Sequence, residues 1–154
     1  AKNYTLEQRK ILVDVLRAQH QHLDLSAKQS QHLDLLLSEN TFTVTTGHQL
    51  NLFSGPVFFV YKILQTIKTA DFLTQNSDKN FVPIFWLATE DHDFEEINHF
   101  KTANGFYQIK GSSGGAVGRI IIEDNSFLEE FEKEFKDDVF GTQLILLANK
   151  AYQH

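Results

Sequence analysis

Two strand-like segments separated by one helical segment constrain the fold of this chain more than any other feature. Residues 41–46 alternate β-branched side chains with others, which is typical of a strand. Residues 81–87 form a continuous apolar run, which is typical of a strand covered on both faces. Between them, residues 56–73 begin with a proline and are apolar on nearly every side, which indicates a buried helix. A strand, a helix and a strand in this order predict a right-handed βαβ unit with parallel strands, so we expect an α/β fold.

Further elements are predicted on both sides of this unit. Residues 5–19 and 26–38 carry apolar side chains at helical spacing, which predicts a helical hairpin outside the sheet. Residues 106–110 and 119–123 favour two strands of a β-hairpin, joined by a glycine-rich turn, and a helix is predicted at 127–135. The glycines between residues 114 and 118 are interpreted as part of this turn and not as a phosphate loop, because no strand leads through them into a helix. The expected organisation is a helical hairpin packed on the core (1–40), the first βαβ unit (41–103), and a connecting insertion of hairpin and helices (104–154).

Charge and composition exclude several classes of protein. The formal net charge of −6 over 154 residues argues against a binder of nucleic acid or of membrane surfaces, because both need a basic surface. The chain has no cysteine, so a disulfide framework and thiolate metal sites are excluded, and a reducing cytoplasm fits this composition. The apolar runs are too short to span a membrane. Methionine is absent, and the apolar helix predicted at 142–154 has no stop signal, so we interpret the chain as a fragment.

The first candidate site segment, residues 47–56, follows the first predicted strand. Ligands of open parallel sheets bind beyond the carboxyl ends of the strands, and the backbone N–H groups at the start of a helix attract phosphate or carboxylate. His48 can transfer a proton or donate to a developing oxyanion near neutral pH. Lys62 is the single charged side chain between residues 41 and 67. The alternative interpretation is that Gly47 makes a turn, His48 caps it, and Lys62 only extends past buried neighbours to solvent.

The second candidate segment follows the second predicted strand and contains Glu90, Asp91, His92 and Asp93. Carboxylates clustered with a histidine suit magnesium, an ammonium group, a hydroxyl group or proton transfer. A purely structural alternative exists for Asp93, because Asp93 and Glu96 have the spacing of a capping box at a helix N-terminus. A zinc site of His92, Glu96 and His99 is a further alternative, although its spacing matches no standard ligand set well.

Two strings of residues carry a specific resemblance to a known family. The first is Thr-Gly-His-Gln at 46–49, followed by Gly-Pro at 55–56 and Tyr-Lys-Ile at 61–63; the second is Phe-Trp-Leu-Ala-Thr-Glu-Asp-His-Asp-Phe-Glu-Glu-Ile-Asn-His at 85–99. These strings resemble the bacillithiol biosynthesis cysteine-adding enzymes, closely over about residues 41–100 and in general character outside them. Members of that family are much longer and carry a C-terminal coiled coil, so the resemblance implies an N-terminal fragment.

The resemblance implies a Rossmann-like core related to class I aminoacyl-tRNA synthetases and nucleotidyltransferases, and a reaction that joins the carboxylate of cysteine to the amine of glucosaminyl-malate. If an adenylate is formed, ATP with magnesium is the implied cofactor. The turn at Gly47, His48 and Gln49 stands where those relatives place a histidine-glycine-histidine signature, but it has one histidine. A second nucleotide-binding motif would lie beyond residue 154, so the fragment is expected to be inactive alone. A homodimer of the full-length protein through the coiled coil is also implied.

The predicted site therefore has two groups of residues. Those expected to take part in the chemistry are His48, Asp91, His92 and Asp93, and those expected to bind substrate or nucleotide are Gly47, Gln49, Asn51, Gly55, Lys62 and Glu90. Two other functions stay open at this point. One is a metal-dependent hydrolase or lyase that uses Asp91, His92, Asp93 and His99. The other is a non-catalytic interaction module whose surface is the helical hairpin at 5–38.

Overall fold

The computed structural model describes residues 4–53, 55–111, 114–122 and 124–152. The chain divides into two compact units. The first unit comprises residues 1–46 and 61–86, and the second comprises residues 47–60 and 87–154. Because β1 (Thr41–Gln49), α3 (Val57–Gln75) and β2 (Asn80–Ala88) each run past these limits, both units contain part of the βαβ segment.

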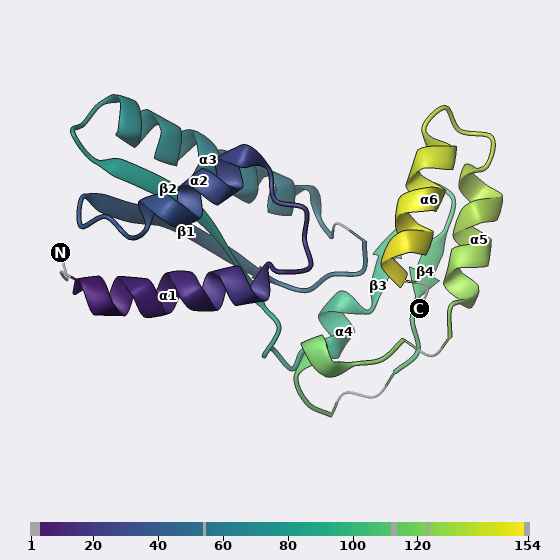
Figure 1. The fold of residues 1–154 in the computed structure, drawn as a ribbon. Helices are drawn as coiled ribbons and strands as arrows, with labels where there is room; N and C mark the ends of the chain where they lie inside the picture. Colours follow the sequence, from purple (N-terminus) through teal and green to yellow (C-terminus); the bar gives the residue numbers. More distant parts are fainter. Residues whose placement is uncertain (1–3, 54, 112–113, 123, 153–154) are drawn as a thin grey trace. The chain divides into compact units, whose positions relative to one another are not determined.

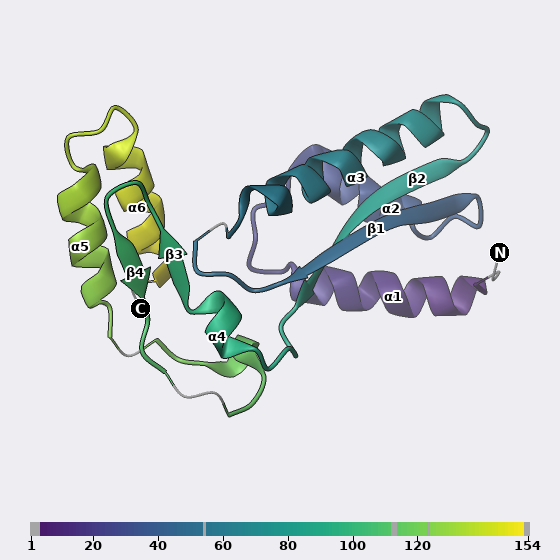
Figure 2. The same cartoon turned by 180° about the vertical axis from the view of Figure 1, so that it is seen from behind.

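The first unit is built on the predicted βαβ arrangement. β1 and β2 form a two-stranded parallel sheet, and α3 is the connection between them (Figure 1). Two helices precede the sheet, α1 (Leu6–Gln19) and α2 (Ala27–Leu35), and they lie on the face opposite α3 (Figures 1 and 2). The predicted α/β class and the N-terminal helical hairpin are therefore confirmed.

Local side-chain signals explain where the two N-terminal helices begin. Thr5 and Ser26 each accept a hydrogen bond from the backbone of the residue three positions later, and the glutamine at that later position bonds back, so both helices start with a complete capping box. Arg17 then joins α1 to α2 through an ion pair with Asp34 at 2.6 Å. Arg9 donates to two backbone carbonyls, those of Leu36 at 3.1 Å and Thr41 at 3.2 Å, and so ties α1 to the end of α2 and the start of β1.

The core of the first unit lies between the helical hairpin and one face of β2. Val13 of α1, Leu36 after α2 and Val82 of β2 are buried together. Partly buried leucines and isoleucines surround them: Leu16, Leu33, Leu35, Leu37 and Ile84. Val82 and Ile84 are two positions apart, so they share the same face of the strand.

The second unit contains the remaining elements. After β2 come α4 (Phe94–Ile97), β3 (His99–Lys101), β4 (Phe106–Gln108), the 3-10 helix η1 (Val117–Arg119), α5 (Ser126–Phe135) and α6 (Gly141–Tyr152). β3 and β4 pair antiparallel with Phe100 opposite Tyr107, and α5 and α6 lie side by side (Figures 1 and 2). An aromatic core joins them, and its buried members include Phe94, Tyr107, Phe127 and Phe131.

The structure places the β-hairpin elsewhere than predicted. The predicted strand at 106–110 is confirmed by β4, but β4 pairs with β3, and residues 119–122 form no strand; Glu123 lies outside the described residues. The predicted turn is also wrong, because Val117 and Gly118 belong to η1 and donate backbone hydrogen bonds to the carbonyls of Asp91 and Thr89. Ser112 and Ser113 of that turn are outside the described residues. A pattern of apolar residues marks a segment as extended but does not say which partner it pairs with.

The expectation of a buried connecting helix is also wrong for this chain. Only Thr66 and Ala70 of the described α3 residues are buried, and Val57 and Tyr61 are 71% and 67% exposed. Trp86 near the end of β2 is exposed as well, so this strand is not covered on both faces along its whole length. The sheet covers only one side of α3, so side chains on the rest of the helix surface stay exposed. Among the residues that the structure describes, no helix is long and apolar enough to cross a membrane.

Candidate functional site

The end of β1 is the first part of the site, and it differs in conformation from the predicted turn. β1 continues through Gly47 and His48 to Gln49, so these residues are part of the strand. The chain turns only afterwards, where Phe53 has a φ of 57°, a value that non-glycine residues rarely adopt. Phe53 is held there by its backbone N–H, which donates to the Tyr152 hydroxyl at 2.7 Å, and by the ring of Phe100, whose centroid is 4.3 Å away. Packing in the second unit therefore fixes the segment that follows the strand.

His48 is half-buried and is in contact with both polar and aromatic neighbours. Its Nδ1 atom lies 3.0 Å from the backbone carbonyl oxygen of Gln49 and 3.0 Å from the amide nitrogen of Asn51. The rings of Phe58 and Phe59 lie against the imidazole, with centroid distances of 5.3 Å and 5.5 Å. His48 and Asn51, which the sequence predicts as site residues, therefore contact each other in the structure.

Gln49 is the most buried of the predicted binding residues, at 8% exposed. Its amide nitrogen donates to the Glu96 carboxylate at 2.5 Å, which fixes the orientation of the amide. The amide oxygen is buried and has no hydrogen-bond partner within the described residues. A buried oxygen of this kind can accept a hydrogen bond from an N–H or O–H group of a ligand or from water.

The acidic segment after β2 is held mainly by its own backbone. Asp91 accepts a hydrogen bond from the Asp93 backbone N–H at 3.0 Å, and its carbonyl accepts one from Val117 at 2.7 Å. Asp93 accepts from the Glu96 backbone N–H at 3.1 Å, so the predicted N-cap of α4 is confirmed. Glu96 does not complete a capping box, because its side chain bonds to Gln49. Glu90 and His92 are exposed.

Glu96 connects the two halves of the predicted site. Its backbone N–H bonds to Asp93 in the acidic segment, and its carboxylate bonds to Gln49 at the end of β1. A second link is the hydrogen bond from the Leu52 backbone N–H to the Ile97 carbonyl at 3.1 Å. The sequence marked Glu96 only as a cap or zinc ligand, and no sequence signal could identify Gln49 as its partner, because the two are 47 positions apart.

The remaining predictions have different outcomes. Gly55 packs beside Asn51 in the second unit, and Lys62 belongs to the first unit. Among the described residues, no group of three or more histidine, aspartate or glutamate side chains is arranged to hold a metal ion. Within this part of the chain, neither the zinc site of His92, Glu96 and His99 nor a three-ligand site from Asp91, His92, Asp93 and His99 is formed.

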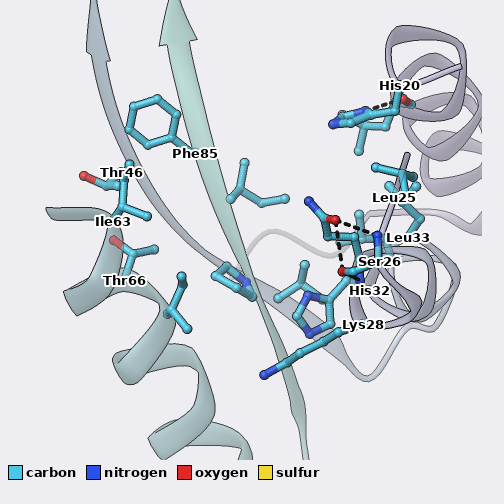
Figure 3. Close-up of a pocket in the computed structure, with 17 residues that line it drawn as sticks. His20, Leu25, Ser26, Lys28, His32, Leu33, Thr46, Ile63, Thr66 and Phe85 are labelled. Carbon is cyan, nitrogen blue, oxygen red and sulfur yellow. Dashed lines mark hydrogen bonds between the residues drawn. The ribbon is translucent and has the colours of Figure 1, made fainter. Parts of the chain in front are cut away.

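A separate pocket of about 420 Å³ lies in the first unit, and none of the predicted site residues lines it (Figure 3). Its walls come from both N-terminal helices, β2, α3 and the Thr46 end of β1. Lys28 on its rim forms an ion pair with Asp71 at 3.2 Å. Burial, assisted by the nearby positive charge of Lys28, lowers the pKa of His32 in its wall. No pattern in the sequence indicates this pocket, because its walls come from segments that lie far apart in the chain.

Comparison with known proteins identifies the family of this chain. Residues 1–154 match the protein-family model described as "Bacillithiol biosynthesis BshC, N-terminal Rossmann-like domain". The chain belongs to this family. Its Rossmann-like character and the resemblance carried by residues 46–49 and 85–99 are thereby confirmed.

Curated relatives in this family carry the name "Putative cysteine ligase BshC". The chain is 42% identical to the relative from Flavobacterium johnsoniae over 154 residues, which is 99% of the chain and 29% of that relative. It is 53% identical to the relative from Christiangramia forsetii over 145 residues, which is 91% of the chain and 26% of that relative. The chain therefore spans less than a third of the length of these BshC proteins.

Proposed function

We propose that this chain is part of a ligase that joins cysteine to glucosaminyl-malate in the last step of bacillithiol biosynthesis. The names of the BshC relatives support a cysteine ligase, and the observation that carries the site is the group connected through Glu96. That group brings His48, Gln49 and the acidic segment into one local structure at the ends of the two strands. Small-molecule substrates follow from the proposed ligase activity, which the names of the relatives support.

The residues of the group offer three chemical functions for amide formation. His48 can donate a proton to, or accept one from, the reacting carboxyl or amine group at neutral pH. The buried oxygen of Gln49 can accept a hydrogen bond from the amine of a substrate. The exposed carboxylates of Glu90 and Asp93, with Asp91 between them, favour a positively charged group such as an ammonium or a magnesium ion.

ATP with magnesium is our proposed source of activation, and the side chains present fit it in part. Magnesium bound to a nucleotide needs only one or two protein carboxylates, since phosphate oxygens and water complete its coordination. Asp91 and its neighbours can supply these, and His48 and His92 are side chains of the connected group that could contact phosphate. ATP would supply the free energy to activate the cysteine carboxylate. Lys62 remains a proposed contributor from the first unit.

Other properties of the whole protein are also proposals. We propose that the chain acts within a longer protein and is inactive alone, because it covers 29% or less of the relatives cited. A cytoplasmic location is supported by the biosynthetic family and the absence of cysteine. A homodimer formed through segments outside this chain follows only from the family resemblance.

The proposal is tested by measuring the product of cysteine and glucosaminyl-malate with the full-length protein, with and without ATP. Wild type should form the amide, and His48→Ala should lose on the order of 10²-fold in rate, since it removes a positioned proton donor. His22→Ala is the matched control, because His22 is an exposed histidine in the first unit. Thermal unfolding of each variant shows whether it is folded.

Three results would count against parts of this proposal. Absence of product from folded wild type under every condition would remove the ligase function. Full activity of His48→Ala would show that His48 is structural and would move the chemistry to the acidic segment. Equal rates with and without ATP would remove nucleotide activation while leaving the ligase function in place.

A further inference from the structure

Asn51 is the polar residue most closely associated with His48. Its amide nitrogen lies 3.0 Å from His48 Nδ1 and 3.1 Å from the Gln49 carbonyl oxygen. That carbonyl oxygen is itself 3.0 Å from Nδ1. Only one of the two contacts at Nδ1 can be a hydrogen bond at a time: a protonated Nδ1 donates to the Gln49 carbonyl, whereas an unprotonated Nδ1 accepts from the Asn51 amide. A backbone carbonyl can only accept, so the nitrogen of the Asn51 amide, and not its oxygen, must face it.

The aromatic neighbours restrict the remaining freedom of the ring. Phe58 is tilted by 47° to the imidazole and Phe59 is nearly perpendicular to it at 73°. Contact with these two rings opposes a change of the imidazole plane, and the contacts at Nδ1 oppose its rotation by half a turn. Nε2 of His48 makes no hydrogen bond within the part of the chain that the structure describes. It is thus the ring nitrogen that remains open to a substrate.

Gly55 gives Asn51 the space that it occupies. Gly55 has a φ of +64°, in the left-handed region that favours glycine. A Cβ atom at this position would lie 2.7 Å from Asn51 Cγ and 2.8 Å from Asn51 Cβ. Any other residue would therefore strain the backbone and push the Asn51 side chain away from His48.

We propose that Asn51 is a positioning residue whose amide donates one hydrogen bond to an unprotonated Nδ1 of His48 and one to the Gln49 carbonyl, so that Nε2, which then carries the proton, is presented to the substrate. Gly55 acts one step further away by keeping Asn51 in place. This differs from direct binding of substrate by Asn51 and Gly55, which the sequence predicted. The inference rests on the proposed function for the role of His48, but the state of the ring can be measured without any reaction.

The first readout is the ¹⁵N spectrum of the full-length protein labelled at the histidine imidazoles. The His48 signals are identified by their loss in His48→Gln. In wild type, one tautomer should dominate, with well-separated Nδ1 and Nε2 shifts. In Asn51→Ala and in Gly55→Ala the two shifts should move toward each other, because the contacts that distinguish the nitrogens are lost. Asn104→Ala, a change of an exposed asparagine in the same unit, should leave them as in wild type.

The second readout is the division of the kinetic effect in the ligase assay. A loss of orientation at His48 should lower kcat of Asn51→Ala by roughly 10- to 100-fold, with KM changed less than about twofold. A rise in KM with unchanged kcat would instead show that Asn51 contacts the substrate, and would overturn the proposal. Unchanged His48 shifts in folded Asn51→Ala would also overturn it. If Gly55→Ala does not fold, Asn51→Ala alone decides the question.

The two proposals fail in different ways. If wild type forms no product but the His48 shifts respond to Asn51→Ala, the ligase function is wrong and the positioning of the ring is correct. If product forms and Asn51→Ala changes neither the shifts nor kcat, the ligase function stands and the positioning role is wrong.

Discussion

At the scale of single residues, Asp93 has a structural task that can be separated from its proposed chemistry. It caps α4, a helix of only four residues, through the Glu96 backbone N–H. Because Glu96 also bonds to Gln49, loss of the cap would disturb the link between the two halves of the site.

Two substitutions of Asp93 distinguish the cap from the chemistry. Asn caps helices about as well as Asp, so Asp93→Asn should stay within about 0.5 kcal/mol of wild type in the free energy of unfolding. Asp93→Ala should lose about 1 kcal/mol. Denaturant unfolding measures both. If Asp93→Asn is stable but loses ligase activity by tenfold or more, the carboxylate itself takes part in the reaction; if it keeps full activity, Asp93 is a cap only.

Tyr107 predicts a pH dependence of stability in the second unit. The pKa of Tyr107 is raised to about 12 from a usual value of 10.0. The main cause is burial, and the second is the hydrogen bond that the hydroxyl donates to Glu134. The neutral phenol is therefore favoured in the folded protein. The contribution of this phenol to the free energy of unfolding is fully present below pH 10 and is lost as the pH rises from about 10 through about 12.

Tyr107→Phe should remove this contribution while keeping the ring, which stacks on Phe100 at a centroid distance of 4.7 Å. The free energy of unfolding of wild type should fall more steeply with pH above about 10 than that of the variant. Denaturant titrations at several pH values measure the two slopes. Tyr4→Phe is the control, because Tyr4 is exposed. Equal slopes for wild type and Tyr107→Phe would contradict the expectation.

At the scale of elements, η1 shows what a pattern of residues could not predict. The glycines around η1 are typical of a flexible turn. Gly118 nevertheless packs directly on Thr89, the residue after β2. η1 forms its backbone hydrogen bonds with Thr89 and Asp91, which lie about thirty residues earlier in the chain. The spacing of apolar residues carries no information on such a contact. The hairpin was misplaced for the same reason.

Gly118→Ala should therefore destabilise the second unit, whereas Gly114→Ala should not. An added Cβ at Gly118 would lie 2.6 Å from Thr89 Cβ and 3.0 Å from its carbonyl oxygen, while one at Gly114 meets nothing within 4 Å. We expect a loss of about 1–3 kcal/mol in the free energy of unfolding for Gly118→Ala, the usual cost of forcing an extra group into a packed contact. A loss of the same size in Gly114→Ala would show that the effect is not specific to the contact with Thr89.

At the scale of the whole molecule, the apolar surface of α3 agrees with the small share of the BshC relatives that this chain covers. Exposed Val57, Tyr61 and Leu64 recur at spacings of three and four residues, so they share one face of the helix. The sequence predicted burial from this pattern, and the prediction is reasonable for a helix in a larger sheet. In the two-stranded sheet described here, the face turned away from the strands stays exposed.

The features of this protein that can be predicted from the sequence alone depend on residues close together in the chain. Capping at Thr5, Ser26 and Asp93 depends on residues three positions apart, and the βαβ order follows from apolar periodicity over short segments. The family resemblance likewise follows from short runs of residues within 46–63 and 85–99. Tertiary packing is what brings Gln49 to Glu96, Asn51 to His48 beside Phe58 and Phe59, and Gly118 onto Thr89. These contacts depend on how the chain turns and on which elements pack together, and no spacing along the sequence encodes that directly.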